Sequence, residues 1–214
     1  MLNDADVAAT WLDRSTLPPL EECVLSEAFW RLLAGNPVLP TDICGATNLL
    51  PQDVENILTT LQAERCLRRD ASGAVVAARG LMTAPSTHLL VTNRGSVYTQ
   101  CTVDAVGIPA ALGLAAGVED HCASCGNRVD ATISQARDVT TDPASAVIVM
   151  ARCDSWAEDG IPTVCRETNF FCSRDHADAW QRERATLPGT ILSPSEAAAI
   201  GRRIWGPFAR EEQP

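Results

Sequence analysis

Nine cysteines stand in a chain of 214 residues that has only one tyrosine and three histidines. An odd number of cysteines does not close into disulfide pairs, and free thiolates bind soft metal ions or act as nucleophiles. Unpaired cysteine is also among the most buried residue types, so packing is the default interpretation of any single one. Chemistry is therefore expected where a cysteine stands beside a second reactive group.

Cys101 and Asp104 form such a pair. The segment before them, SVYTQ, is typical of a strand, and the apolar run after them is typical of a helix. Cys101 is then expected at the helix N-terminus with Thr102 as the cap, where the helix dipole lowers the pKa of a thiol. A thiol beside a carboxylate supplies a nucleophile and a proton carrier. The alternative is a buried strand cysteine followed by an ordinary first-turn carboxylate.

Cys165 is the second candidate. It follows the loop EDGIPT and precedes an expected strand in ETNFFCS, and Arg166 stands next to it. A thiol at a loop edge beside a cation is predicted to have a lowered pKa. The alternative is a packing cysteine, for which Cys172 is the better example. Residues alone give no reason for Cys101 and Cys165 to meet.

Cys122 and Cys125 belong to the motif HCASCG. A CxxC before glycine is half of a zinc knuckle and is also a redox spacing. A zinc site needs two further ligands, yet the sequence has no second CxxC and no HxxxH, and only Cys153 or His121 suggest themselves. We therefore expect a packing or turn role for this pair rather than metal binding or redox chemistry.

The other two histidines have ordinary interpretations. His88 lies in an apolar strand segment, where a hydrogen-bonded structural histidine is more common than a metal ligand. His176 lies in the polar opening of an expected helix.

The first part of the chain is predicted to be helical. Helical spacing of apolar residues marks 21–35, two shorter helices are expected over 41–48 and 51–66, and two strands around a turn over 66–80. This is the outline of a winged helix, so residues 1–83 are predicted to form a helical winged-helix-like module. The helix at the position of a recognition helix has Asp53 and Glu55 near its start, where a DNA-binding protein carries Arg or Lys. We expect a scaffold that packs against the second domain, with DNA binding as the minor alternative.

Residues 84–214 change in character. Strands are expected over 87–92 and 96–101, joined by a turn at 93–95, and again near 128–134 and 145–152. Two helices finish the chain, and the last begins with a capping box from Ser193 to Glu196 and ends at Gly206. The predicted class is α+β: the helical winged-helix-like module, then a mixed, largely antiparallel sheet domain flanked by helices over 84–214.

Composition limits the partners. An apolar share of 46% and a charged share of 21% fit an ordinary globular protein. No run is apolar enough to cross a bilayer, and the acidic start lacks the features of a signal peptide, so a cytoplasmic location is expected. A net charge of −10 disfavours nucleic acid and favours a neutral or cationic substrate.

Three segments, taken in order, resemble one family, the organomercurial (alkylmercury) lyases. YTQCTVDAVGIPAALG over 98–113 is similar to the family's active-site stretch, in which a cysteine and an aspartate three apart precede an apolar run with proline. HCASCG is similar to its next landmark, and VCRETNFFCS to its third, where an essential cysteine stands five residues before a Phe-Phe pair. The resemblance covers roughly 89–205, and the earlier part only in outline.

The resemblance implies roles for individual residues. Cys101 and Cys165 match the two mercury-binding cysteines, Asp104 the essential aspartate, and Cys122 a cysteine regarded as structural. The sequence departs from the family where many members have an aromatic residue before the first cysteine, because Gln100 stands there, and where many have a second cysteine after the later one, because Arg166 stands there. Cys125 is an additional cysteine that the family pattern does not contain.

The activity implied by the resemblance is protonolysis of the carbon–mercury bond of R–Hg⁺. It needs no cofactor, and the Hg(II) product passes to low-molecular-weight thiols or a mercuric reductase. Three alternatives stay open: a non-catalytic Hg or Cu binder or sensor that uses Cys101, Cys165 and also Cys122 and Cys125; a relative acting on another organometal, which Gln100 leaves open; and a winged-helix regulator.

Overall fold

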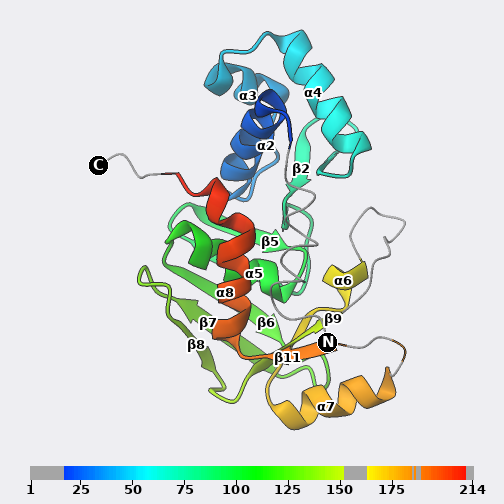
Figure 1. Cartoon of the computed structure of the whole chain (residues 1–214), viewed down its shortest axis with the longest axis vertical. Coiled ribbons are helices and arrows are strands. Elements are labelled where there is room, and N and C mark those ends of the chain that lie inside the picture. The colour runs from blue at the N-terminus through cyan, green and yellow to red at the C-terminus, as the bar shows by residue number, and fades with distance from the viewer. Residues whose placement is uncertain (1–16, 152–162, 185, 187–188, 211–214) are drawn as a thin grey trace.

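The structure is a computed structural model, and it describes residues 17–151, 163–184, 186 and 189–210. Figure 1 shows the helices and strands along the chain. The helices are α2 Pro19–Leu32, α3 Pro40–Thr47, α4 Pro51–Ala63, α5 Thr102–Leu112, α6 Thr163–Arg166, α7 Arg174–Glu183, α8 Pro194–Trp205 and the 3-10 helix η1 Gly206–Phe208. The strands are β1 Leu67–Arg69, β2 Val75–Ala78, β3 Leu81–Met82, β4 Leu89–Thr92, β5 Gly95–Thr99, β6 Ala116–His121, β7 Arg128–Ile133, β8 Val139–Asp142, β9 Val147–Ala151, β10 Asn169–Phe171 and β11 Gly189–Leu192.

Three helices, α2 to α4, gather at one end of the molecule together with β2 (Figure 1). Each begins with proline at its first position, where a missing N–H costs nothing. The apolar residues at helical spacing in α2, including Val24, Phe29 and Leu32, are buried. The helices predicted over 21–35, 41–48 and 51–66 are therefore confirmed.

The wing also forms as predicted, since β1 and β2 pair in antiparallel fashion. The carboxylate of Glu55, in α4, accepts two hydrogen bonds of 2.8 and 2.9 Å from the guanidinium of Arg69, in β1. Glu55 thus joins the helix to the wing, which agrees with a scaffold role for this module.

Eight strands form one sheet in the order β1-β2-β3-β5-β4-β6-β7-β8, and its neighbours are antiparallel. The sheet runs from the wing into the second part of the chain without a break. A smaller sheet has the order β10-β9-β11. The α+β class with a largely antiparallel sheet is confirmed, whereas the domain boundary at 83/84, which falls between β3 and β4, stays a prediction.

Four strands were not predicted: the two-residue β3, and β6, β8 and β11. β6 has the sequence AGVEDH, whose acidic residues hide its alternation. In the fold Glu119 is exposed while Asp120 is buried, because the Asp120 carboxylate lies 2.6 Å from Nδ1 of His88. β8 forms an edge of the large sheet and is half exposed, so it carries little apolar signal.

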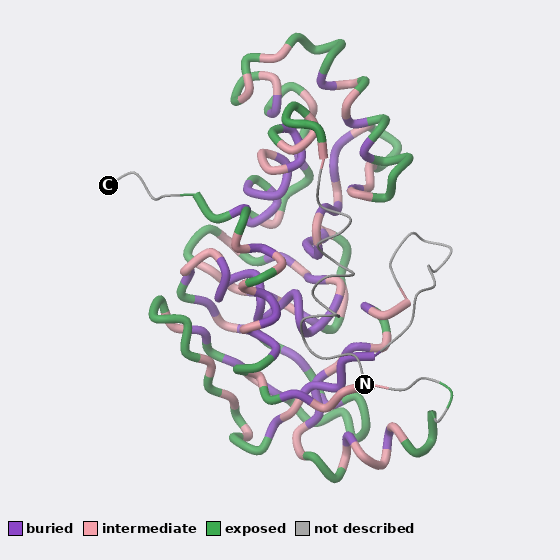
Figure 2. Tube along the Cα trace, in the orientation of Figure 1, coloured by how far each residue is buried: buried purple, intermediate pink, exposed green. Residues whose placement is uncertain are grey.

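α5 lies at the centre of the molecule, and Figure 2 shows its trace among the buried segments. All of its residues up to Ala111 are buried. α8 crosses it at two glycines: a Cβ atom added to Gly107 would lie only 2.7 Å from the Cα of Gly201. The capping box predicted at Ser193 and Glu196 starts α8, as both reciprocal hydrogen bonds are present.

In the described part of the chain, no helix has the length and apolar character needed to cross a membrane.

Candidate active site

Cys101 is the N-cap residue of α5, in extended conformation between β5 and the helix. Its sulfur accepts a hydrogen bond of 3.4 Å from the backbone N–H of Asp104, and its carbonyl accepts one of 3.0 Å from Oγ1 of Thr99. The prediction that Thr102 caps the helix is wrong, since Thr102 is already the first helical residue. The sulfur itself does the capping and is thereby fixed relative to Asp104.

Cys165 lies in the one-turn helix α6 and is 1% exposed. The prediction of a loop-edge thiol is therefore wrong: the short helix packs its cysteine inward. Most of the loop EDGIPT, to residue 162, lies outside the described residues. The strand predicted after Cys165 is confirmed as β10.

Thr168 joins the backbones that carry the two cysteines. Its carbonyl accepts a hydrogen bond of 3.4 Å from the N–H of Thr102, directly after Cys101. Its own N–H donates to the carbonyl of Cys165 at 3.4 Å, and its hydroxyl oxygen accepts from the N–H of Ala151, in β9, at 3.1 Å. Because Thr168 is 1% exposed, these bonds are shielded from water.

The result is that Cys101, Asp104 and Cys165 meet, although 64 positions separate the two cysteines. The two sulfurs and a carboxylate oxygen of Asp104 all lie within 4.8 Å of one another, and all three residues are buried. They share a pocket whose other walls are mostly apolar: Val103, Met150, Val164, Thr168, Ile200, Ile204 and Trp205. The pocket thus combines two thiols and one carboxyl in surroundings that exclude water.

Burial raises the pKa of Asp104 from its ordinary value of 3.8 to about 7, against the lowering effects of a hydrogen bond from Cys101 and the charge of His88. Its Oδ2 atom is buried without a hydrogen-bond partner among the described residues. An unpaired buried oxygen costs free energy unless it carries a proton or meets a substrate. This carboxyl is therefore able to hold and release a proton near neutral pH.

The pKa values of the two thiols differ from the prediction. Burial, with the neighbouring Cys165 and Asp104, raises the pKa of Cys101 well above its ordinary value. For Cys165 a hydrogen bond with Cys101 lowers the pKa, but burial and the charge of Asp104 raise it by more. The prediction of lowered thiol pKa values is therefore wrong for the free protein. Desolvation raises these pKa values by more than the helix dipole and Arg166 lower them. Both sulfurs are therefore neutral thiols at neutral pH.

Gly80 presses its backbone against Asp104, and no sequence signal marked it. A Cβ atom at Gly80 would lie 2.8 Å from Cγ of Asp104, and its φ of +94° favours glycine. The residue before it, Arg79, accepts a hydrogen bond of 3.0 Å at its carbonyl from the indole N–H of Trp205 in the pocket wall. Gly80 thus helps to fix the position of the Asp104 carboxyl.

We expect Gly80→Ala to lower turnover at least about tenfold, because the added methyl group displaces the Asp104 carboxyl from the two sulfurs. Gly73→Ala is the matched control: its φ is +87°, but its Cβ would meet the movable end of Arg69. Both variants should lose about 1–3 kcal/mol of stability through backbone strain. Rates measured per folded molecule should fall only for Gly80→Ala, and equal rates in the two variants would contradict the positioning role.

Gln100 and Arg166, the two departures from the family pattern, do not line the pocket in the part of the chain that is described. The N–H of Gln100 donates to the carbonyl of Gly80 at 2.8 Å. Its backbone therefore takes part in holding Gly80 beside Asp104.

A second group of sulfurs lies elsewhere. Cys122 and Cys125 are joined by Cys172 and His176, and the four side chains offer ligand atoms within 4.8 Å of one another. Cys172 and His176 were not predicted as partners of this pair, because their CxxxH spacing is neither of the two zinc-ligand patterns, CxxC and HxxxH, expected in the sequence. The described cysteines are all free, and among them only Cys23 and Cys125 are exposed.

Two neutral thiols share a buried, mostly apolar pocket with a protonatable carboxyl, and such a set of groups is suited to a soft metal centre beside a proton donor. Comparison with known proteins agrees. Residues 81–206 match the family MerB, alkylmercury lyase. The alkylmercury lyase of Staphylococcus epidermidis is 26% identical over 92% of this chain and 83% of its own length. That of Streptomyces lividans is 29% identical over 82% of this chain and 80% of its own length.

The fold is also shared. The crystal structure of the mercury-bound form of MerB2 superimposes with a TM-score of 0.80 at 21% identity, covering 95% of this chain and 98% of that one. The chain belongs to the MerB alkylmercury lyase family. The family resemblance seen in the sequence, and the expectation of an enzyme of this family, are confirmed.

Proposed function

We propose that this protein cleaves the carbon–mercury bond of organomercurial cations, with Cys101 and Cys165 as mercury ligands and Asp104 as proton carrier. The observation that carries the proposal is the meeting of these three groups within 4.8 Å in a buried pocket. Mercury(II) is a soft ion that prefers thiolate to oxygen or nitrogen. The apolar wall suits the organic group R.

In the first step Cys101 binds R–Hg⁺. A sulfur–mercury bond forms, and the thiol proton passes to the Asp104 carboxylate, with which Cys101 shares a hydrogen bond. The product is a neutral Cys101–Hg–R adduct beside a protonated Asp104. Burial supports this order, because it disfavours charge on both groups.

In the second step the Cys165 sulfur adds to the metal and its proton leaves the site. The added electron density makes the carbon attached to mercury basic, and Asp104 delivers its proton to that carbon as a general acid. The carbon–mercury bond breaks with its electron pair on carbon. The sum is R–Hg⁺ plus two thiols giving R–H, Hg(II) bound to two thiolates, and one proton.

A proton carrier separates an enzyme from a simple metal trap. Two thiolates alone hold mercury, and a trap needs no buried carboxyl whose Oδ2 atom has no hydrogen-bond partner among the described residues. A group with a pKa of about 7 is also best suited to accept and give back a proton near neutral pH. No step draws on a cofactor. Release of Hg(II) from two sulfurs calls for competing thiols or a mercuric reductase, in a reducing compartment such as the cytoplasm.

The test is to incubate reduced protein with phenylmercury and excess thiol and to measure benzene and bound Hg(II). Benzene over many turnovers is expected from the wild type. Cys165→Ser should capture phenylmercury on Cys101 and stall as a phenylmercury adduct seen by intact mass, whereas the exposed Cys23→Ser should match the wild type. Tight mercury binding without benzene in the wild type would make the site a trap and overturn the proposal.

A further inference from the structure

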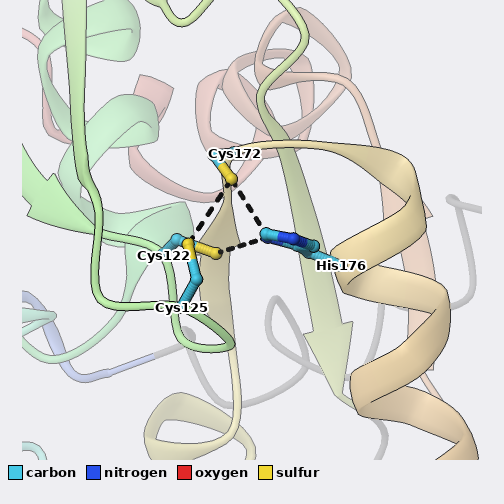
Figure 3. Close-up of side chains that lie close together, drawn as sticks. All are labelled: Cys122, Cys125, Cys172 and His176. Atoms are coloured by element: carbon cyan, nitrogen blue, oxygen red, sulfur yellow. Dashed lines mark hydrogen bonds between the residues drawn. The ribbon is translucent and has the colours of Figure 1, made fainter.

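Four side chains outside the active site converge at the junction of the two sheets (Figure 3). Cys122 and Cys125 stand in the turn between β6 and β7 of the large sheet. Cys172 directly follows β10 of the small sheet, and His176 lies in the first turn of α7. The four come from two places in the sequence and meet only in the fold.

Three distances among the four ligand atoms are close to those of a tetrahedral metal site. Around Zn(II), with Zn–S of about 2.3 Å and Zn–N of about 2.0 Å, sulfurs lie about 3.8 Å apart and a sulfur lies about 3.5 Å from a nitrogen. Here Sγ of Cys125 and Sγ of Cys172 are 3.7 Å apart. Nδ1 of His176 lies 3.6 Å from Sγ of Cys122 and 3.1 Å from Sγ of Cys172.

The backbone around the turn is also that of a metal knuckle. The N–H of Gly126 donates to the carbonyl of Cys122 at 2.8 Å, and Gly126 has a φ of +73° that closes the turn. The turn thus holds Cys122 and Cys125, two of the four candidate ligands, next to each other.

Packing does not account for this group. A packing role calls for buried side chains, yet Cys125 is exposed, and Cys172 and His176 are only partly buried. Nor does the reaction use it, since the active-site pocket is lined by other residues. His121, the ligand suggested by sequence, is exposed and lies outside the group.

We propose that Cys122, Cys125, Cys172 and His176 bind one structural Zn(II) ion. The protein fills all four positions of a tetrahedral site, so the ion has no open position for catalysis. It would tie the β6–β7 turn to the start of α7, the segment that follows Cys165 and β10. The ion thus holds the small sheet, and with it one mercury ligand, against the large sheet.

The experiment is metal analysis of the full chain purified with a reductant and without added mercury. We expect one zinc per chain. Co(II) replacing it should give the visible absorption bands of a tetrahedral thiolate site. Cys125→Ser and His176→Asn should each weaken zinc binding at least about tenfold. Cys23→Ser and His121→Asn are the matched controls with exposed residues and should keep the zinc, as should Cys101→Ser, which separates this site from the mercury pocket.

Stability gives a second readout that does not depend on turnover. A strong chelator should lower the melting temperature of the wild type and of the controls but not that of the two ligand variants. Three results would overturn the proposal: wild-type protein without zinc, equal zinc in Cys125→Ser and His176→Asn, or a disulfide between Cys125 and Cys172 in the purified protein. Zinc lost from Cys101→Ser instead would assign the ion to the mercury pocket.

Discussion

Asp104→Asn is expected to slow hydrocarbon release by about 10²–10⁴-fold, the usual contribution of a general acid, while capture of R–Hg⁺ by the thiols persists. The amide keeps the shape of the carboxyl but gives up no proton to carbon. Capture and cleavage are separated by a single-turnover measurement that follows the protein–phenylmercury adduct by mass and benzene by gas chromatography. The adduct should accumulate in the variant.

Asp53→Asn is a matched control for this substitution. Asp53 occupies the third position of α4, as Asp104 does in α5, but it is exposed. Its replacement should leave both capture and cleavage at wild-type rates. Cleavage at the wild-type rate in Asp104→Asn would remove the carboxyl from the mechanism, and loss of capture as well would make it a mercury ligand rather than a proton carrier.

The same substitution is expected to change how stability depends on pH. The folded pKa of Asp104, about 7, lies above the ordinary value of 3.8. The folded protein therefore binds a proton that the unfolded chain has lost, and stability falls as pH rises through this interval. From pH 5 to pH 8 the group should cost the wild type about 2–3 kcal/mol of unfolding free energy.

In Asp104→Asn this contribution to the pH dependence of the unfolding free energy is absent, because the amide does not titrate. The test is urea denaturation of both proteins at pH 5, 6, 7 and 8. Cys101 and Cys165 are present in both proteins, so their titration contributes to both curves. As pH rises, the free energy of unfolding of the variant should increase relative to that of the wild type. A constant difference between the two proteins caused by the buried amide, already present at pH 5, does not affect this trend. Parallel curves would show that Asp104 titrates in the folded protein much as it does in the unfolded chain.

The sequence was informative where the chemistry is local. Cys101 and Asp104 are three residues apart at a strand–helix junction, and helical geometry alone put them on one side. Cys165 could be added only through family resemblance, because the bonds through Thr168 that bring it to Cys101 arise from tertiary structure. Apolar periodicity was enough to predict the helices of the winged module.

Properties that depend on burial could not be predicted from the sequence. The thiol pKa values were expected to fall, because the helix N-terminus and Arg166 are visible in the sequence while the desolvation that outweighs them is not. Gly80 was overlooked for a similar reason, since its contact with Asp104 joins the turn between β2 and β3 to α5 across the fold. The acidic strand β6 was missed because its alternation shows only once Asp120 is seen to face inward.

Three of the eight cysteines in the described part of the chain are buried and three more are partly buried, and this bears on how the protein withstands the Hg(II) ion that it releases. An unfolded chain offers nine thiols, so free Hg(II) binds it more readily than the folded protein and draws the population toward the unfolded state by mass action. In the described part of the folded chain, only Cys23 and Cys125 are exposed. Inactivation through the less accessible thiols outside the active site then requires unfolding, so the lifetime of the protein in the presence of Hg(II) depends on its kinetic stability.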